Sequence, residues 1–440
     1  MLASNHFSKV HSILSIKSAS VLGCCCGLTA TIIAGLGADW PQYRGPARDG
    51  KLLSTDLKLD SLPTESKPVW RVKIGGGFAS PVVASGRVFY SDEQAGQEVL
   101  HALDEKSGKE LWNRPYAAVF SDEWGTGPRC TPVVNGDRVF VQSCKGVFRC
   151  LSVTDGRELW GFDFEKDYGV KFLGRVEVPE ASARRRGHSG SAIPVKDQIV
   201  VAVGNTNGAS LVCLNQADGK VVWKCGNDEA AYSNLMEASF HGVRQVVAYT
   251  ADSLMGVRFD NGAILWRVPI KTAAKRHAVT PIVFGDRVIV SSHTHGLLCY
   301  QITRKTERSE EIWESKPAWA NKDLKISLAT LVELNGTLYG QGPEKNLVAV
   351  NAFTGQSRWS QDGFGERSLT GYTSTLAIGN RLLALSEQGV LVLLEANPDS
   401  YQELSRLQVC GKNWSHPAFA KNILYLRDNR ELFALDLRGK

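Results

Sequence analysis

The sequence lacks the short motifs that mark common catalytic and metal-binding sites. It contains no H-E-x-x-H, no phosphate-binding loop, no nucleophile elbow and no EF-hand-type calcium run, so these kinds of site have no support. It also lacks C-x-x-C and C-x-x-C-H, which excludes zinc-ribbon, thioredoxin-type and c-type haem sites. No stretch shows sustained helical periodicity, and we therefore expect almost no helix.

The chain has little excess of either charge. Its 51 Lys and Arg residues against 45 Asp and Glu residues give a net charge of +6, which falls to +4 without Lys9 and Lys17. A positive charge this small and this evenly spread does not favour nucleic acid as a partner.

The first 38 residues carry no acidic side chain. Residues 1–17 are polar with Lys9 and Lys17, and residues 18–38 hold no charged residue. This order is typical of a signal peptide, although about 20 apolar residues can also stay as a membrane anchor, and Cys24 offers a site for lipid attachment. We expect residues 1–38 to be a signal peptide or anchor, and residues 39–66 to be an N-terminal extension. The protein is then exported, either periplasmic or membrane-anchored and facing the periplasm.

A repeated hairpin organises the rest of the chain. The stretch LHALDEKSGKELW at residues 100–112 returns at residues 150–160, 212–223, 257–266 and 348–359, with a longer copy at 298–313. A simpler hairpin precedes each copy, as in SPVVASGRVFY and TPVVNGDRVFV. Apolar alternation around a turn that contains glycine predicts hairpins. Units of four strands that recur every 40–50 residues or so are the signature of propeller blades.

The number of units sets the architecture. Units open near residues 80, 131, 191, 238, 280, 330, 374 and 415, and the last unit has only three strands. Residues 67–74 (KPVWRVKI) can supply the missing fourth strand, because Trp70 stands in the repeat's tryptophan position. We therefore predict a monomeric, all-β, eight-bladed β-propeller over residues 67–440, closed by the N-terminal strand pairing into the last blade. Seven blades is the alternative.

The repeat places a tryptophan at the end of most units, where a large apolar ring can dock between neighbouring blades. We expect this structural role for Trp70, Trp112, Trp160, Trp223, Trp266, Trp313 and Trp359.

Two places break the period of the repeat. A separation of 63 residues between Trp160 and Trp223, against 42 between Trp70 and Trp112, predicts an insertion, and charged residues lengthen the hairpin at 303–311. Long loops in compact repeats are often functional, which makes the insertion a candidate functional loop, whereas we expect the charged lengthening at 303–311 to be inert.

The residues just before each unit, here called the lead-in segments, are the candidates for ligand contacts. In a propeller they gather around the mouth of the central channel, where converging polar groups form the default ligand site. The candidates are Arg129, Arg186, His188, His277, Trp414 and His416. The alternative is that these side chains only hydrogen-bond the loops. No residue is assigned a catalytic or metal-binding role.

Residues 39–50 (DWPQYRGPARDG) lie outside the repeat and are rich in Pro, Gly and Arg. We expect this segment to cross one face of the ring. Its residues Trp40, Tyr43 and Arg44 then act either as a packing clamp or as part of a ligand surface.

The cysteines do not define a disulfide framework. Three of the ten fall at residues 24–26, and the other seven are an odd number, so at least one is unpaired in an exported protein. Cys144 and Cys150 flank a short turn and can pair across it, or both can remain buried thiols. The sequence leaves open the state of Cys130, Cys144, Cys150, Cys213, Cys225, Cys299 and Cys410.

The strand, the Asp-x-x-Gly-Lys turn and the closing Trp resemble the tryptophan-docking repeat of the pyrroloquinoline-quinone (PQQ) propeller superfamily, over about residues 67–437. That superfamily contains quinoprotein alcohol dehydrogenases and also non-catalytic members similar to BamB, the outer-membrane barrel-assembly factor. The dehydrogenases place adjacent cysteines against the quinone, whereas adjacent cysteines occur here only at residues 24–26. A calcium-binding set and a catalytic Asp cannot be matched either.

The resemblance therefore implies an exported, non-catalytic scaffold that binds a protein partner in the cell envelope and needs no cofactor. The N-terminal segment can add a membrane association. The alternative is a dehydrogenase that uses PQQ with calcium. A third hypothesis is a protein that binds a small anionic ligand at the channel mouth.

Overall fold

The computed structural model describes residues 39–53, 57–170, 187–364 and 371–438, and almost all regular structure in them is β-strand. The exception is one short helix, α1 (Phe164–Tyr168). Within these ranges no helix is long and apolar enough to cross a membrane. The expectation of an all-β chain with almost no helix is confirmed.

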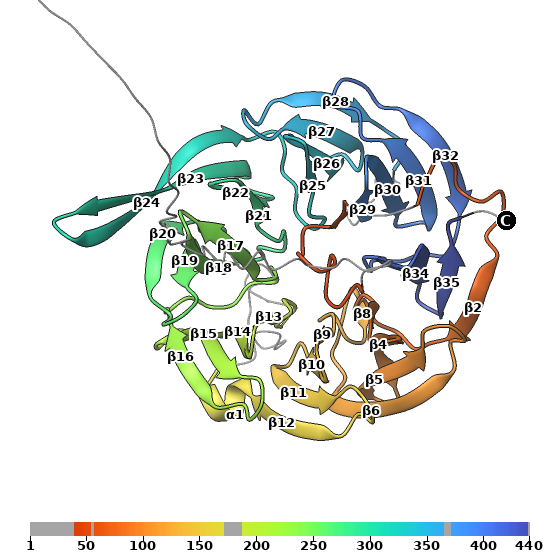
Figure 1. The fold of residues 1–440 in the computed structure, drawn as a ribbon, viewed down its shortest axis with the longest axis horizontal. Coiled ribbons are helices and arrows are strands. Elements are labelled where there is room, and N and C mark those ends of the chain that lie inside the picture. The colour runs from red at the N-terminus through yellow and green to blue at the C-terminus, as the bar shows by residue number, and fades with distance from the viewer. Residues whose placement is uncertain (1–38, 54–56, 171–186, 365–370, 439–440) are drawn as a thin grey trace, which may run out of the picture. The chain divides into compact units, whose positions relative to one another are not determined.

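The strands form eight four-stranded antiparallel blades arranged in a ring (Figure 1). Blades 1 to 4 follow the chain in order. Blade 1 consists of β3 (Val82–Ala84), β4 (Arg87–Gln94), β5 (Gln97–Asp104) and β6 (Glu110–Ala118), and blade 2 of β9 (Val133–Asn135), β10 (Arg138–Gln142), β11 (Val147–Ser152) and β12 (Glu158–Asp163). Blade 3 consists of β13 (Ile193–Val195), β14 (Gln198–Asn205), β15 (Ala209–Asn215) and β16 (Val221–Cys225), and blade 4 of β17 (Met236–Phe240), β18 (Val243–Tyr249), β19 (Ser253–Arg258) and β20 (Ile264–Pro269).

Blades 5 to 8 complete the ring. Blade 5 consists of β21 (Ile282–Phe284), β22 (Arg287–Ser292), β23 (Gly296–Glu307) and β24 (Glu310–Asn321), and blade 6 of β25 (Val332–Leu334), β26 (Thr337–Gln341), β27 (Leu347–Asn351) and β28 (Ser357–Gln361). Blade 7 consists of β29 (Thr373–Ile378), β30 (Arg381–Ser386), β31 (Val390–Glu395) and β32 (Glu403–Gln408), and blade 8 of β33 (Ala418–Ala420), β34 (Ile423–Arg427), β35 (Glu431–Asp436) and β2 (Pro68–Lys73).

The ring closes as the sequence predicts. β2 pairs with β35 and places Trp70 opposite Ala434, so the outermost strand of blade 8 comes from the start of the propeller. This pairing removes the open sheet edge that an incomplete eighth blade would expose. The prediction of eight blades is confirmed, and the alternative of seven does not apply.

The position of a strand within its blade decides how much of the strand is buried. Middle strands such as β30 and β34 are buried on both faces, because each blade packs between two neighbours. Outer strands such as β32 and β20 alternate between covered and exposed residues. The cores therefore lie between adjacent blades, and each apolar cluster joins residues of neighbouring sheets.

Tryptophans on outer strands tie most blades to the next one. Each of six donates its Nε1–H to a backbone carbonyl in the turn of the following blade: Trp70, Trp112, Trp160, Trp223, Trp319 and Trp359. In the first five, the ring also lies against the turn glycine, so closely that a Cβ there would clash with it.

Two tryptophans differ from the expected pattern. Trp266 lies in the cluster between blades 4 and 5, but its Nε1–H donates to Gln245 Oε1 of its own blade at 2.8 Å. Trp313 does not hold the docking position of blade 5, and Trp319 holds it instead. The assignment of Trp313 is wrong because β23 and β24 are each 12 residues long, which moves the docking position further along the outer strand.

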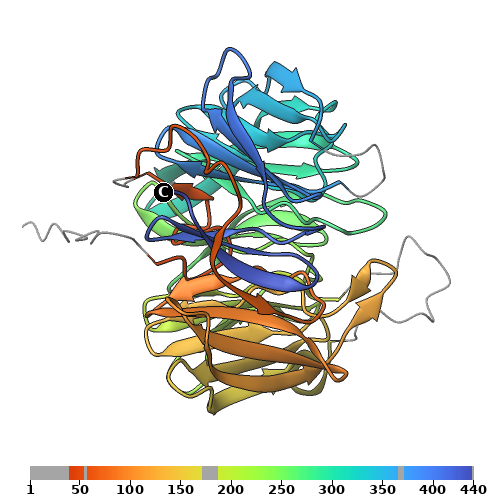
Figure 2. The same ribbon diagram turned by 90° about the vertical axis from the view of Figure 1, so that its right-hand side faces the viewer.

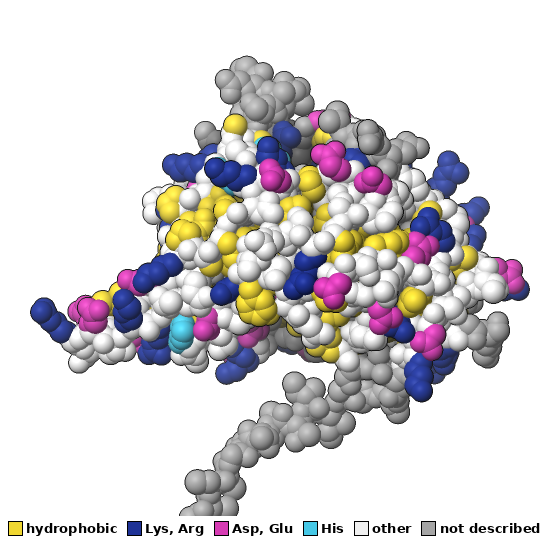
Figure 3. All heavy atoms as spheres, turned by 90° about the horizontal axis from the view of Figure 1, so that it is seen from above, with side chains coloured by type: hydrophobic (Ala, Val, Ile, Leu, Met, Phe, Trp, Pro, Cys, Tyr) yellow, Lys and Arg dark blue, Asp and Glu magenta, His cyan; other side chains and the backbone are white. Residues whose placement is uncertain are grey.

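The long β23–β24 hairpin projects from the ring (Figures 1 and 3). Its end carries charges of both signs, and Arg304 and Arg258 both pair with Glu311. The second extra element is the small hairpin of β7 (Ser121–Asp122) and β8 (Gly125–Thr126) between blades 1 and 2. It projects from the ring on the side opposite the red N-terminal segment (Figure 2).

Residues 39–53 cross the ring and plug its centre. Trp40 pairs with Val83 of blade 1, and the carbonyl of Pro41 accepts a hydrogen bond from Val134 of blade 2. β1 (Lys51–Leu52) then adds in parallel to β29 of blade 7. The expected crossing segment is present, and it contacts blades on opposite sides of the ring.

Two buried arginines anchor this plug to backbone carbonyls. Arg44 donates to Thr330 and Leu331 of blade 6, at 2.7 and 2.9 Å. Arg48 donates to Ser191 of blade 3 and Leu235 of blade 4, at 3.2 and 3.1 Å. Burial lowers the pKa of Arg48 to about 9, so its guanidinium still carries its charge at neutral pH. Trp40 and Arg44 are therefore a packing clamp.

Candidate functional site

A cavity of about 450 Å³ lies on the axis of the ring, above the plug. Every blade contributes to it through its lead-in segment, by Ser80, Thr131, Ser191, Asn234, Ala278, Ser327, Tyr372 and Trp414. Concave sites of this size commonly hold ligands. The lead-in segments thus meet at one place, as the propeller topology requires.

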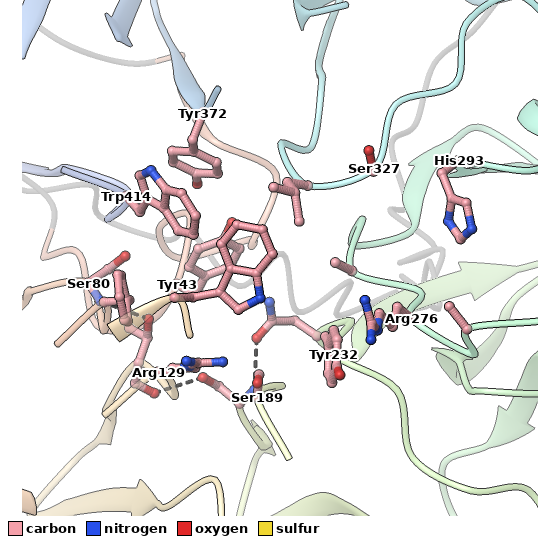
Figure 4. A pocket seen from close by; sticks show the side chains of 18 residues that line it. Tyr43, Ser80, Arg129, Ser189, Tyr232, Arg276, His293, Ser327, Tyr372 and Trp414 are labelled. Atoms are coloured by element: carbon pink, nitrogen blue, oxygen red, sulfur yellow. Dashed lines mark hydrogen bonds between the residues drawn. The ribbon is translucent and has the colours of Figure 1, made fainter. Parts of the chain in front are cut away.

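Tyr43 of the plug lies at the base of the cavity (Figure 4). Its backbone lies between Gln42, whose side chain accepts a hydrogen bond from Arg48 at 2.7 Å, and the anchored Arg44. The anchors that hold the plug therefore also fix the cavity's base. Of the three plug residues singled out from the sequence, Tyr43 alone lines the cavity.

One wall of the cavity is aromatic. The rings of Phe78 and Trp124 lie 5.6 and 5.9 Å from that of Trp414, centroid to centroid. Trp124 stands at the turn of the β7–β8 hairpin, and its side chain is 40% exposed. These three residues also line a second cavity of about 410 Å³ beside the first. The aromatic wall thus separates two hollows on the same face.

The polar atoms of this wall are not all satisfied by the protein. The buried Nε1 of Trp414 has no hydrogen-bond partner among the described residues. Tyr232 and Tyr372 add phenol rings from blades 4 and 7 (Figure 4). Aromatic rings with a polar end suit surfaces that bind a partner.

Two arginines give the cavity a basic lining, and a histidine adds a polar ring. Arg129 donates to Asp122 Oδ1 at 2.5 Å, and its guanidinium lies over the Phe78 and Phe120 rings at 5.4 and 4.9 Å. Arg276 and His293 lie across the cavity (Figure 4). Burial, and secondarily Arg276, lowers the pKa of His293. Among the described residues that line the cavity, none is Asp or Glu.

The candidates chosen from the sequence separate into three groups. Arg129 and Trp414 line the cavity. Three histidines are buried beside it and do not line it, namely His188, His277 and His416. Arg186 lies outside the described residues.

The buried histidines are packed into the walls of the ring. His277 stacks on Tyr249 with ring centroids 4.2 Å apart, and its Nδ1 lies 2.7 Å from the carbonyl oxygen of Thr250. Burial lowers the pKa of His277 to about 4 and that of His416 to about 3. Both rings are therefore neutral at pH 7, and the geometry agrees with the alternative in which such residues hold the loops.

Sequence reasoning missed several residues that line the cavity. Trp124, Tyr232 and Arg276 each stand within a few residues of a chosen candidate or a lead-in segment. Their position was therefore a usable signal. The alternation of strands does not show which loop side chains turn inward, and so it cannot rank one loop residue over its neighbour.

The cavity does not fit the PQQ and calcium pair. Calcium takes six to eight oxygen ligands, several of them carboxylates, and the described residues of the lining supply no carboxylate. Over the described part of the chain, no group of three or more His, Cys, Asp or Glu residues is placed to hold a metal ion. We therefore derive no chemical step through a quinone or a calcium ion.

Comparison with known proteins gives a consistent result. A family model described as "Outer membrane protein assembly factor BamB" matches residues 48–179, 145–235 and 182–327. The outer membrane protein assembly factor BamB of Moranella endobia is 25% identical over 336 residues, which cover 72% of this chain and 78% of that protein. The protein of the same name from Yersinia pestis is 22% identical over 339 residues, with 71% and 75% covered.

A solved structure agrees at the level of the fold. The crystal structure of BamB from Moraxella catarrhalis superimposes with a TM-score of 0.56 and 14% sequence identity, and the match covers 84% of this chain and 99% of that one. At this identity the likeness establishes the fold and leaves the site residues to be argued from this chain.

Proposed function

Because this chain belongs to the outer membrane protein assembly factor BamB family, we propose that it is a non-catalytic propeller that binds protein during the assembly of outer-membrane proteins. It is exported and acts in the cell envelope, on the periplasmic side. The observation that carries the proposal is the family match, whose overlapping segments together span residues 48–327, from the plug to the lead-in segment of blade 6.

The make-up of the ring supports binding as its task. The cavity is lined by aromatic rings, hydroxyl groups and two arginines, which recognise partners. A closed ring anchored by a buried plug is a rigid platform, and a rigid platform loses little conformational entropy when a partner binds.

We place the protein partner on the face that carries the cavity. Trp124 and Leu328 line the cavity and are 40% and 42% exposed, which is high for large apolar side chains. Exposed apolar residues around a concave site mark protein-binding surfaces. Aromatic anchors set in a polar and cationic rim carry most of the binding energy in such surfaces.

The first test uses cells that lack this chain. They should contain less folded outer-membrane β-barrel protein, measured by the heat-dependent mobility of those proteins in gels, and the wild-type chain should restore it. A tagged wild-type chain should co-purify from the envelope with components of the outer-membrane assembly machinery. Normal levels of folded barrels, together with no such co-purification, would refute the proposal.

The second test locates the binding face. Replacing Trp124 and Leu328 together by Ala should weaken partner binding by tenfold or more, because loss of a hot-spot side chain costs about 2 kcal/mol or more. The matched control is Leu111→Ala on β6, which removes a side chain that is 47% exposed on the outer rim of blade 1. Equal binding by both variants would move the partner away from the cavity face.

The mode of membrane attachment and the monomeric state belong to the same proposal. Residues 1–38, expected to be a signal peptide or anchor, lie outside the described residues. We propose that they direct export and that the propeller acts as a monomer. The mass of the mature chain distinguishes cleavage, lipid attachment at Cys24 and retention of the segment. Light scattering of the purified chain gives its oligomeric state.

A further inference from the structure

Two buried cysteines of blade 2, both free thiols in this structure, are hydrogen-bonded to the same residue, His188. Cys130 belongs to the lead-in segment before β9, and Cys144 to the turn between β10 and β11. We propose that Cys130 and Cys144 form a disulfide bond in the mature protein. This inference goes beyond the proposed function and rests on one part of it, export into a compartment where disulfides persist.

The strand register brings the two residues together. β9 and β10 pair Val133 with Phe140. Beyond this pairing, Gln142 Nε2 at the end of β10 donates to the Sγ of Cys130 at 3.7 Å, and Gln142 stands two residues before Cys144. Both cysteines are buried, so each thiol has a fixed environment.

A single residue of the next blade holds both cysteines. The Sγ of Cys130 donates to the carbonyl oxygen of His188 at 3.1 Å. The backbone N–H of His188 donates to the carbonyl oxygen of Cys144 at 2.9 Å. Gly187 packs so closely on Cys144 that a Cβ there would lie 2.3 Å from the Cys144 oxygen. The lead-in segment of blade 3 therefore contacts both cysteines.

The pairing that the sequence left open, between Cys144 and Cys150, does not agree with this geometry. The β10–β11 register sets Cys150 opposite Phe140, four residues away from Cys144 along β10 and its turn. Cys150 belongs to the apolar cluster between blades 2 and 3. Cys130 is thus the sulfur partner that the fold offers to Cys144.

The chemistry is an oxidation by thiol–disulfide exchange. Each thiol gives up its proton, one S–S bond forms between Cys130 and Cys144, and the two electrons reduce the disulfide of an exported oxidant protein to two thiols. Burial raises the pKa of Cys130 well above its usual value, which disfavours the reactive thiolate in the folded state. The bond therefore forms while blade 2 is still folding, and burial then shields it from reductants.

The bond would brace the cavity wall. Cys130 lies between Arg129 and Thr131, which both line the cavity, and His188 is followed by Ser189, which lines it as well. A link from Cys130 to the turn at Cys144 fixes the backbone that presents these side chains. The disulfide thus connects the redox state of the compartment to the rigidity of the proposed binding site.

Peptide mapping tests the proposal directly. The tagged full chain is purified from exporting cells, denatured in an alkylating reagent without reductant, and cut with trypsin. Cleavage after Arg129, Arg138, Lys145, Arg149 and Arg157 places the three cysteines in separate peptides, residues 130–138, 139–145 and 150–157. We expect peptide 130–138 to be linked to peptide 139–145 and to separate on reduction. Recovery of both as alkylated single peptides, or a link from 139–145 to 150–157, overturns the proposal.

Cysteine-to-serine variants and a refolded preparation of the chain show whether the link joins these two cysteines and whether it depends on export. Cys130→Ser should leave Cys144 alkylated, and Cys144→Ser should leave Cys130 alkylated, whereas the control Cys299→Ser should keep the link. Reduction should lower the melting temperature of the wild type but not that of Cys130→Ser. Cell fractionation tests export separately, and refolding with oxidised glutathione tests the pair without export. If the chain is found in the cytosol but the link still forms on refolding, the proposal of export is refuted and the proposed pairing of Cys130 with Cys144 still stands.

Discussion

At the scale of single residues, buried polar side chains join parts of the chain that are far apart in sequence. Arg44 and Arg48 reach blades 3, 4 and 6 from the plug, and Arg427 of blade 8 donates to the carbonyls of Ala79 and Ser91 in blade 1. A buried guanidinium is stable only when its N–H groups are paired. These arginines therefore stabilise particular junctions of the ring.

Arg48→Met tests the plug. The substitution keeps the apolar stem but leaves the carbonyls of Ser191, Ala192 and Leu235 without their donor. We expect the free energy of unfolding to fall by about 4 kcal/mol, measured by urea denaturation. The control is Arg71→Met, whose exposed pair with Glu431 should cost less than about 1 kcal/mol. Equal losses for the two variants would contradict the anchoring role of Arg48.

His277 predicts part of the pH dependence of stability. Its pKa is about 4 in the fold against 6.5 when unperturbed, so the unfolded chain binds the proton more readily. The stabilisation is complete above pH 6.5 and is lost as the pH falls toward 4. Glu98, whose pKa burial raises to about 7, acts in the opposite direction, and its contribution falls as the pH rises.

The comparison of wild type with His277→Phe isolates the histidine, because Glu98 is common to both. The free-energy advantage of the wild type should shrink by about 3 kcal/mol between pH 7 and pH 4. Denaturation curves at intervals across that range provide the measurement. A constant difference would mean that His277 is not held neutral in the fold.

At the scale of elements, the sequence predicts the blades well because each blade is a local repeat. Hairpin pairing needs only the alternation of apolar and polar residues and a turn, and both occur within a sequence segment of about 40 residues. The docking tryptophans follow a further rule that the structure makes visible. Each stands opposite a small residue of the third strand, as Trp112 opposes Ala102, Trp160 opposes Cys150 and Trp319 opposes Cys299.

That rule explains why Trp313 was the wrong choice. Trp313 lies opposite Arg304, toward the end of the long hairpin, where its ring meets the Arg304 guanidinium. Spacing from the turn alone pointed to Trp313, whereas the small residue Cys299 selects Trp319. The interpretation failed because the added strand length lies between the turn and the docking position.

A pair of glycine variants measures the docking of a tryptophan on the next blade. Gly219 and Gly208 both have positive φ, of 70° and 84°, so Ala adds similar backbone strain at each. A Cβ at Gly219 would lie 2.7 Å from the Trp160 ring, whereas nothing lies within 4 Å of one at Gly208. Gly219→Ala should therefore lose about 1–3 kcal/mol more than Gly208→Ala, measured by urea denaturation. Equal losses would show that Trp160 does not depend on the turn glycine.

At the scale of the whole molecule, eight lead-in segments meet on one axis, and this convergence makes the site. The sequence identifies those segments because each precedes a repeat unit. It does not identify which side chains turn inward, because that depends on contacts between blades and with the plug. His277 turns toward Tyr249 of blade 4, and Tyr43 reaches the cavity from a segment outside the repeat.

A binding test with PQQ and calcium addresses the alternative hypothesis of a dehydrogenase. We expect calorimetry of the purified chain with PQQ and calcium to give no saturable one-to-one binding, and the quinone's absorbance to stay unchanged. The reason is the cavity's lining, whose described residues offer arginines and aromatic rings but no carboxylate for calcium. Chelation of divalent cations should likewise leave the melting temperature unchanged. Saturable calcium-dependent binding by the folded chain would contradict this prediction, and a screen of alcohol substrates would then follow.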